Sequence, residues 1–120
     1  MISLQFIDTE ILTDEISGTR EWINRFTEEY GKSVGELYYF FCSDEYLYKM
    51  NVELLGHDFY TDIITFPLNE CDDILSAEFH ISIDRIRENA VTFNRSFKDE
   101  LHRVMAHGVL HLIGFDDLCE

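Results

Sequence analysis

The chain has 120 residues, a formal net charge of −15, 46% hydrophobic residues and a single proline. This length suits one ordinary domain with one core, and the apolar content excludes a disordered chain, which could not offset its ordering entropy. The acidity argues against the broad lysine- and arginine-rich face with which most nucleic-acid-binding proteins contact phosphates. Any contact with RNA would therefore be local, or assisted by a bound cation.

The location of the protein can also be inferred from the sequence. No segment approaches the run of about 18 apolar residues that spans a membrane, and residues 1–8 lack the basic start and long apolar stretch of a signal peptide. Cys42, Cys71 and Cys119 form an odd, scattered set, which indicates a reducing compartment rather than a disulfide framework. We therefore expect a single cytoplasmic domain over residues 1–120 that does not contact a membrane.

Hydrophobic periodicity predicts a strand, a helix and a second strand in the first third of the chain. Residues 2–7 alternate as a short strand does. Residues 14–30 carry apolar side chains at helical intervals and stop at Gly31, which predicts an amphipathic helix. Residues 36–42 are dense in aromatic side chains and favour a strand covered on both faces. Exposed aromatics can also stack on the bases of single-stranded nucleic acid, but a core role is favoured for so dense a run.

The middle of the chain predicts a second helix and a third strand. Ser43 or Asp44 can cap the helix, and Gly56 is expected to end it. Residues 57–60 read as a connector. The strand that follows, over residues 61–67, has a proline at its end.

The last part of the chain predicts one strand and two helices. An acidic turn precedes residues 74–83, whose alternation has a period of two. Asp84 can cap a helix, and the final helix is expected from about Phe97 to Leu112. The complete order of elements predicts an α+β domain with a four-stranded mixed sheet and helices packed on it, without deciding which strands form its edges.

Two histidines lie one helical turn apart in the final helix, at His107 and His111. Residues four apart project from the same face of a helix, so both imidazoles could bind one ion. Gly114 can adopt the left-handed conformation that ends a helix, which would let the chain double back and bring Asp116 or Asp117 to the ion. Asp117 has the spacing of a third ligand. Three nitrogen and oxygen ligands with one open position are typical of a catalytic zinc site, and the implied chemistry is hydrolytic.

This ligand spacing is similar to that of metalloproteases that carry glutamate directly after the first histidine as a general base. Gly108 stands there in this chain, and glycine cannot move a proton. Proteolysis is therefore the weaker interpretation, although a metallohydrolase of peptides or small substrates is retained as an alternative. Cys119 lies two residues after Asp117 and could be a softer ligand, but a bystander thiol is favoured.

The same segment resembles a known signature. Residues 107–117 read His-Gly-Val-Leu-His-Leu-Ile-Gly-Phe-Asp-Asp, which is similar to the signature of the YbeY family of bacterial rRNA maturation factors. Residues 61–67 resemble the family's Thr-Asp-Val-Leu-Ser-Phe-Pro strand, and residues 78–82 resemble its Asp-Ile-x-Ile-Ser strand. The first motif is specific, whereas the two strand motifs would be weak alone.

The resemblance implies a metal-dependent, single-strand-specific endoribonuclease that acts in rRNA processing. It implies one metal ion, usually zinc, which His107, His111 and Asp117 would hold in this chain. The implied partners are rRNA, ribosomal particles and a ribosomal or assembly protein.

The chain departs from the family pattern in three places. Asp117 replaces the usual third histidine, which adds negative charge and admits manganese or iron beside zinc. Leu55 occupies the position of an arginine that would clamp the scissile phosphate. Family members usually continue into another helix, whereas this chain stops three residues after Asp117, so the domain is interpreted as naturally short or truncated.

Other arginines could replace the missing clamp. Arg103 lies four residues before His107 on the same helical face and is the catalytic candidate. Arg85 and Arg87 are alternatives, and all three could instead be ordinary solvated side chains.

Carboxylates near the motif suggest positioning rather than proton transfer. Glu100 could orient a metal ligand, as could Asp62 or Glu78, but none is a convincing general base. The sequence therefore keeps a second hypothesis open, a non-catalytic ribosome-associated assembly factor in which the metal only organises the C-terminus.

Overall fold

Each predicted strand and helix has a counterpart in the computed structural model, which describes residues 1–10, 14–69 and 73–117, the last three by backbone alone. The elements in chain order are β1 (Ile2–Phe6), α1 (Thr19–Glu29), β2 (Ser33–Cys42), α2 (Asp44–Leu55), β3 (Ile63–Pro67), β4 (Ile74–Ser82), α3 (Ile83–Thr92) and α4 (Phe97–Asp117).

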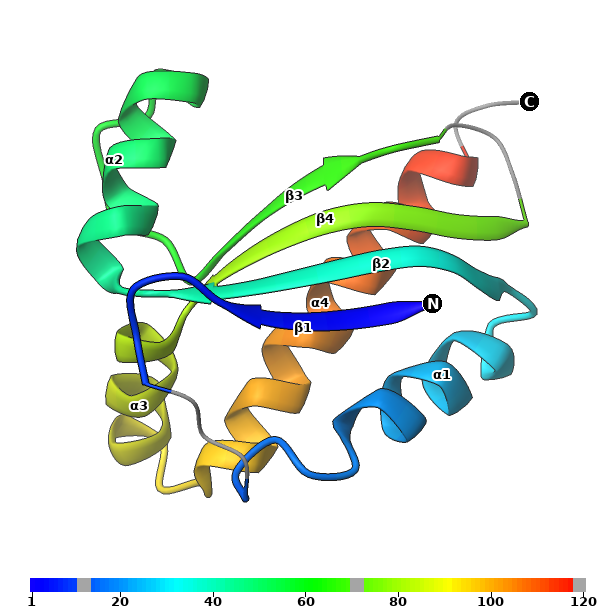
Figure 1. Ribbon diagram of the computed structural model, residues 1–120, viewed down its shortest axis with the longest axis horizontal. Helices are drawn as coiled ribbons and strands as arrows, with labels where there is room; N and C mark the ends of the chain where they lie inside the picture. Colours follow the sequence, from blue (N-terminus) through cyan, green and yellow to red (C-terminus); the bar gives the residue numbers. More distant parts are fainter. Residues whose placement is uncertain (11–13, 70–72, 118–120) are drawn as a thin grey trace.

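The strands form one mixed sheet in the order β1-β2-β4-β3. β1 pairs with β2 in parallel, β2 pairs with β4 in parallel, and β3 runs antiparallel to β4. The predicted four-stranded mixed sheet is confirmed, and β1 and β3 are its edges. α1, α3 and α4 lie on one face of the sheet, whereas α2 stands at the ends of the strands, beside the start of β3 (Figure 1).

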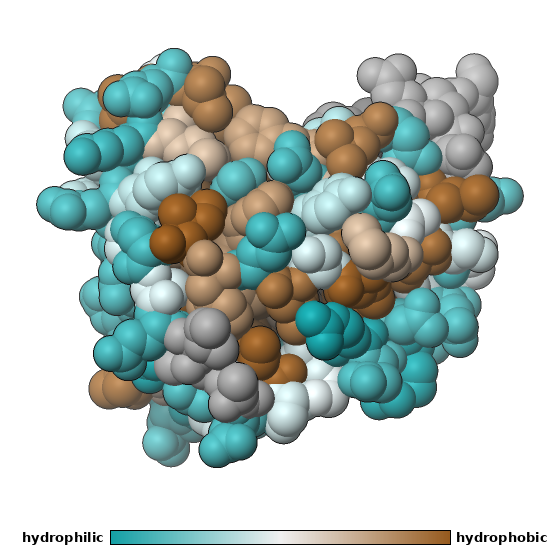
Figure 2. Space-filling model, viewed as in Figure 1, coloured by the Kyte–Doolittle hydropathy of each residue, from teal (hydrophilic) through white to brown (hydrophobic). Residues whose placement is uncertain are grey.

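The aromatic run of β2 supplies much of the core. Leu37, Tyr39 and Phe41 are fully buried on the face that the helices cover, and the Tyr39 ring stacks on Phe79 with 4.7 Å between ring centroids. Tyr38 and Phe40 point to the opposite face and are only half-buried. The core role of this run is therefore confirmed, but most of β2 is fully covered on one face rather than on both. Apolar side chains remain visible on the less covered face, among polar ones (Figure 2).

The ends of α2 follow from two local signals in the sequence. The Ser43 hydroxyl accepts a hydrogen bond from the Tyr46 amide at 3.1 Å and caps the helix start. Gly56 ends the helix in the left-handed region at a φ of 68°, which glycine adopts without strain. Both signals were predicted, and together they fix where the chain leaves α2 toward β3.

Two other helix starts differ from expectation. α1 begins at Thr19 rather than at Asp14. α3 is capped by Ser82, whose hydroxyl accepts from the Arg85 amide at 3.1 Å, rather than by Asp84. Serine at the end of a strand can cap a helix as well as aspartate can, so the pattern alone could not choose between them.

Within the described residues, no helix combines the length and the apolar character needed to cross a lipid bilayer. Cys42 is a free, buried thiol whose pKa is raised to about 12, chiefly by its burial. Cys71 and Cys119 lie outside the described residues.

Candidate metal and substrate site

A pocket of about 360 Å³ opens beside the edge strand β3. Its lining comes from the end of α2, from the segment that leads into β3, from β3 itself and from the middle of α4. Because α2 and α4 are far apart in the sequence, only the fold brings their residues together at this edge. Figure 2 shows the outline of the molecule hollowed above β3, to the right of α2.

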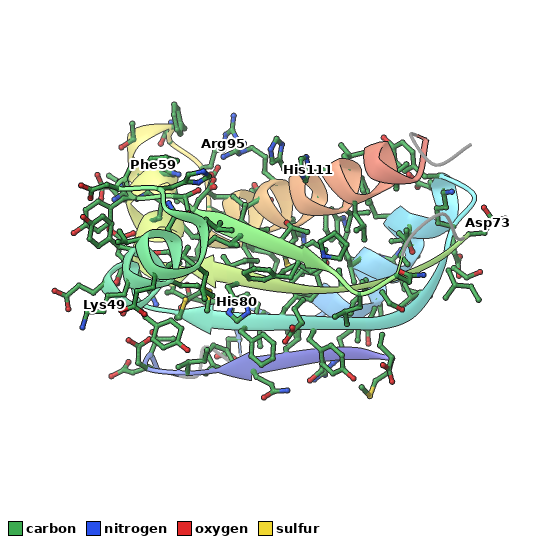
Figure 3. All side chains as sticks on the ribbon, turned by 90° about the horizontal axis from the view of Figure 1, so that it is seen from above. Lys49, Phe59, Asp73, His80, Arg95 and His111 are labelled. Carbon is green, nitrogen blue, oxygen red and sulfur yellow. The ribbon has the colours of Figure 1, made fainter. Side chains whose placement is uncertain are left out.

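His107 and His111 lie on consecutive turns of α4, and both are exposed and line the pocket. Figure 3 shows His111 projecting from α4 on the same side of β3 as Phe59. The opposite face of α4 is anchored by the buried side chains of Leu101, Val104, Met105, Val109 and Leu112. The two histidines are therefore brought together as predicted, on a helix that the core holds in place.

Gly108 lies where α4 approaches the sheet most closely. A Cβ atom at this position would lie 2.9 Å from Ile63 Cδ1 and 2.9 Å from Phe79 Cε1. A residue such as glutamate would have to push α4 away from the sheet. The absence of a base after His107 therefore has a packing reason, and position 108 faces the core.

The turn expected at Gly114 is not formed, and that prediction was wrong. α4 continues through Gly114 to Asp117, and Gly114 is not among the glycines with positive φ. Glycine in a helix costs only about 1 kcal/mol relative to alanine, which does not by itself stop a helix. The backbone at Asp117 lies about one and two-thirds turns beyond His111. The side chains of Asp116 and Asp117 lie outside the described residues, as does Cys119.

The two imidazoles suit a divalent transition metal at a site open to solvent. Among the side chains that the structure describes, no group of three His, Cys, Asp or Glu is placed to hold a metal ion. The Asp117 carboxylate is not among those side chains. The two imidazoles are donors of the kind that bind such an ion. The metal site itself, with its third donor, stays a prediction.

Glu100 and Arg103 form an ion pair one to two turns before His107. Arg103 donates to Glu100 from Nε at 3.0 Å and from Nη2 at 2.6 Å, and Arg95 lies 3.3 Å from the same carboxylate. Glu100 is fully buried, whereas the Arg103 side chain is 45% exposed. The hydrogen bonds from Arg103, with the charges of both arginines, lower the pKa of Glu100. Glu100 was one of three carboxylates that could orient a metal ligand, and in the structure its carboxylate contacts two arginines.

The two alternative arginines point elsewhere. Arg85 donates to Asp44 at 2.8 Å, and Arg87 lies 3.6 Å from Glu15. Among the described residues that line the pocket there is no arginine, so Arg103 lies outside the lining as well. Of the three arginines considered from the sequence, Arg103 is the one on the helical face that carries His107.

The two other candidate carboxylates are separated by the sheet. Asp62 lines the pocket, and its charge adds to that of the hydrogen-bonded Glu100 in raising the pKa of Arg103. Glu78 pairs in register with Tyr38 and Phe66 on the face opposite to the helices. Asp62 is therefore placed to act near the histidines, and Glu78 is not.

Several pocket residues come from the end of α2 and the connector after it, and three of them bear on function. Leu55, at the position of the arginine expected from the family pattern, lines the pocket and is 41% exposed. His57 and Phe59 line it as well. From the sequence alone, residues 57–60 were expected only to connect the second helix to the third strand. The signal that could have drawn attention to them is a run of ring side chains directly after the helix-ending Gly56.

Comparisons with known proteins agree with this arrangement. The profile of the family described as Endoribonuclease YbeY matches residues 5–120. A protein named Endoribonuclease YbeY from Cytophaga hutchinsonii is 46% identical over 110 residues, which are 92% of this chain and 77% of that protein. One of the same name from Bacteroides thetaiotaomicron is 50% identical over 99 residues, 82% of this chain and 72% of the relative.

A solved structure shows the same fold. The solution structure of a Thermotoga maritima protein superposes with a TM-score of 0.69 at 28% sequence identity, covering 97% of this chain and 74% of the other. Because the family profile covers nearly all of the sequence and the curated relatives are closely similar over most of their length, the chain belongs to the family Endoribonuclease YbeY.

Proposed function

We propose that this chain is a metal-dependent endoribonuclease that cuts single-stranded RNA in the pocket beside β3. One observation carries the proposal: His107 and His111 lie side by side on α4 and line an open pocket, in a member of a family named for endoribonuclease activity. The pocket volume of about 360 Å³ is within the range of sites that bind small ligands, so it can admit part of a nucleotide.

The proposed cofactor is one zinc ion held by His107, His111 and Asp117. Such an ion acts as a Lewis acid toward a phosphodiester and lowers the pKa of water when bound. The oxygen donor of Asp117 would also suit manganese or iron. Asp62, which lines the same pocket, is proposed to position the histidines or the substrate rather than to bind the ion.

Arg103 is the proposed contact to the RNA phosphate. A guanidinium carries five N–H donors, and Arg103 uses Nε and Nη2 to hold Glu100. The guanidinium is charged at physiological pH, and the hydrogen bonds to Glu100 raise the pKa of Arg103 further. With 45% of the side chain exposed, Arg103 is available to a phosphate that lies over the turn before His107.

The proposed natural substrate is ribosomal RNA within ribosomal particles, which places the activity in the cytoplasm. The net charge of −15 supports a partner that brings its own positive surface, such as a ribosomal or assembly protein. In that arrangement the partner supplies the attraction to phosphate, and this chain supplies the cutting site.

The test is cleavage of a labelled single-stranded RNA by zinc-loaded protein, compared with His111→Ala. We expect His111→Ala to lower the cleavage rate by more than about 100-fold. Even the mutation of a residue that only hydrogen-bonds to a metal ligand typically lowers metal affinity or activity by about 10- to 100-fold. The matched control is Leu110→Ala, which changes a neighbouring exposed residue of α4 and should keep the wild-type rate. The same RNA in a duplex should be cut more slowly.

Two outcomes would contradict the proposal. Equal rates for the wild-type protein and His111→Ala would show that the cleavage belongs elsewhere. No cleavage by either protein, combined with binding to ribosomal particles, would favour the assembly factor, the alternative that Leu55 and the acidity of the chain support.

A further inference from the structure

The connector between α2 and β3 is held in one conformation by contacts at both ends. The His57 amide donates to the Asn51 carbonyl at 3.1 Å, directly after the left-handed Gly56. The Asn51 side chain, 2% exposed, donates from Nδ2 to the Phe59 carbonyl at 2.9 Å. A buried amide that bridges the connector in this way fixes the backbone on which the next side chains stand.

Side chains of this connector point alternately to two sides. His57 and Phe59 line the pocket, and their rings stack with 5.1 Å between centroids and 15° between planes. Asp58, which lies between them in the sequence, accepts a hydrogen bond from the Tyr48 hydroxyl. Tyr60, which follows them, stacks on the Tyr48 ring with 4.4 Å between ring centroids. Asp58 and Tyr60 thus hold the connector against Tyr48 of α2. His57 and Phe59, on the other side, present two stacked rings to the pocket.

Phe59 is largely exposed although its ring stacks on a neighbouring ring. It is 55% exposed and continues the stack begun by His57. Figure 3 shows Phe59 on the same side of β3 as His111. An exposed aromatic ring beside a pocket offers a flat surface on which a nucleobase can stack.

The charge of the pocket favours stacking over phosphate binding at this end. Among the described residues that line it there is no lysine or arginine, and Asp62 contributes a carboxylate. The α2 end carries Leu55 instead of a cation. Stacking of a nucleobase on an aromatic ring needs no positive charge and accepts any base, so it can supply affinity where phosphate contacts cannot.

We propose that His57 and Phe59 form a stacking platform for an unpaired nucleobase of the RNA next to the bond that is cut. The inference rests on the proposed endoribonuclease function and names how the same pocket selects its substrate. Bases in a duplex are already stacked on their neighbours, so only a single strand can place one on Phe59. The platform therefore accounts for preference for single strands without base-specific contacts.

Binding is tested without cleavage, using a single-stranded RNA of roughly eight nucleotides with 2′-O-methyl groups and one 2-aminopurine, in the presence of EDTA. The wild-type protein should quench the 2-aminopurine fluorescence by stacking. Phe59→Ala and Phe59→Leu should both weaken binding by about 5- to 150-fold and lose the quenching, since leucine keeps the bulk but not the flat ring. Phe59→Tyr, which keeps the ring, should retain both.

Two controls separate stacking from general damage. Phe93→Ala removes an equally exposed ring, 57% exposed at the end of α3 and outside the pocket, and should bind as the wild-type protein does. An RNA that is abasic at the 2-aminopurine position should bind the wild-type protein and Phe59→Ala equally. Unchanged binding and quenching by Phe59→Ala, or equal losses in Phe59→Tyr and Phe59→Ala, would overturn the platform, as would a lack of binding by the wild-type protein.

The binding assay and the cleavage assay can fail independently of each other. Quenched binding without any cleavage by zinc-loaded protein would overturn the endoribonuclease and leave the platform in place. Cleavage with an unchanged KM in Phe59→Ala would overturn the platform alone.

Discussion

At the scale of single residues, Gly108 explains how two histidines come to lie close to an edge strand. Its missing side chain lets α4 approach Ile63 and Phe79 until a Cβ atom would lie 2.9 Å from each. In the sequence, this glycine only argued against a protease. In the structure, it also determines how near His107 and His111 can lie to the rest of the pocket.

Gly108→Ala should destabilise the fold. Alanine improves helix propensity by about 1 kcal/mol, but forcing a methyl group against the fully buried Phe79 ring costs about 1–3 kcal/mol. Because the buried Phe79 ring has little room to move away, we expect a net loss of up to about 2 kcal/mol in the free energy of unfolding, measured with urea.

The contact with Ile63 supplies a matched test of that prediction. Ile63→Val removes the Cδ1 atom that the new methyl group would meet. The cost of Gly108→Ala should therefore be smaller in an Ile63→Val background. A Gly108→Ala variant more stable than the wild-type protein would show that propensity, not close packing, decides this position.

At the scale of elements, α4 depends on a buried carboxylate near its start. Glu100 accepts from Arg103 at 2.6 Å and lies 3.3 Å from Arg95, and it is fully buried. These contacts join the segment that leads into α4 to the turn that precedes His107. The same pair orients the guanidinium of Arg103, which is the proposed contact to the RNA phosphate.

Acid should weaken this link. The pKa of Glu100 is lowered from its ordinary value of 4.5 by the hydrogen bonds and charges of the arginines. A carboxylate with a folded pKa below its unfolded pKa contributes stability that is fully present above the unfolded value and is lost as pH falls through the folded value. Glu100→Gln should therefore lose about 2 kcal/mol at neutral pH and show a flatter decline of stability below about pH 4.5.

Urea unfolding at a series of pH values measures this effect. The control is Glu88→Gln, whose carboxylate is 67% exposed beside Arg85 and should change stability little. Parallel pH profiles for the wild-type protein and Glu100→Gln would contradict the assigned role of Glu100.

At the scale of the whole molecule, the sequence predicted what periodicity and local signals control. The mixed sheet, the cap at Ser43, the end of α2 at Gly56 and the shared face of His107 and His111 are all present. The helix ends and the histidine pair depend on residues within a few positions of one another, where propensity and side-chain spacing act directly. The class of sheet followed from the order of the elements along the chain.

Features that depend on tertiary contacts could not be predicted in this way. The strand order places β3 at an edge and so brings His57 and Phe59 to the same pocket as His107. No local pattern shows that the connector and α4 line one pocket, because His57 and His107 are about 50 residues apart in the sequence. Gly114 failed as a stop signal since glycine permits a left-handed turn but does not require one.

The central claim is that the pocket beside β3 holds a metal ion between α4's two histidines. Metal content per chain, measured by mass spectrometry after zinc loading and gel filtration, tests it most directly. The wild-type protein and His57→Ala, which alters a pocket residue that is not a proposed ligand, should each hold about one zinc ion. His107→Ala and His111→Ala should hold almost none, and Asp117→Ala should lose stoichiometric zinc. Equal zinc in the wild-type protein and both histidine variants, or none in the wild-type protein, would contradict the account.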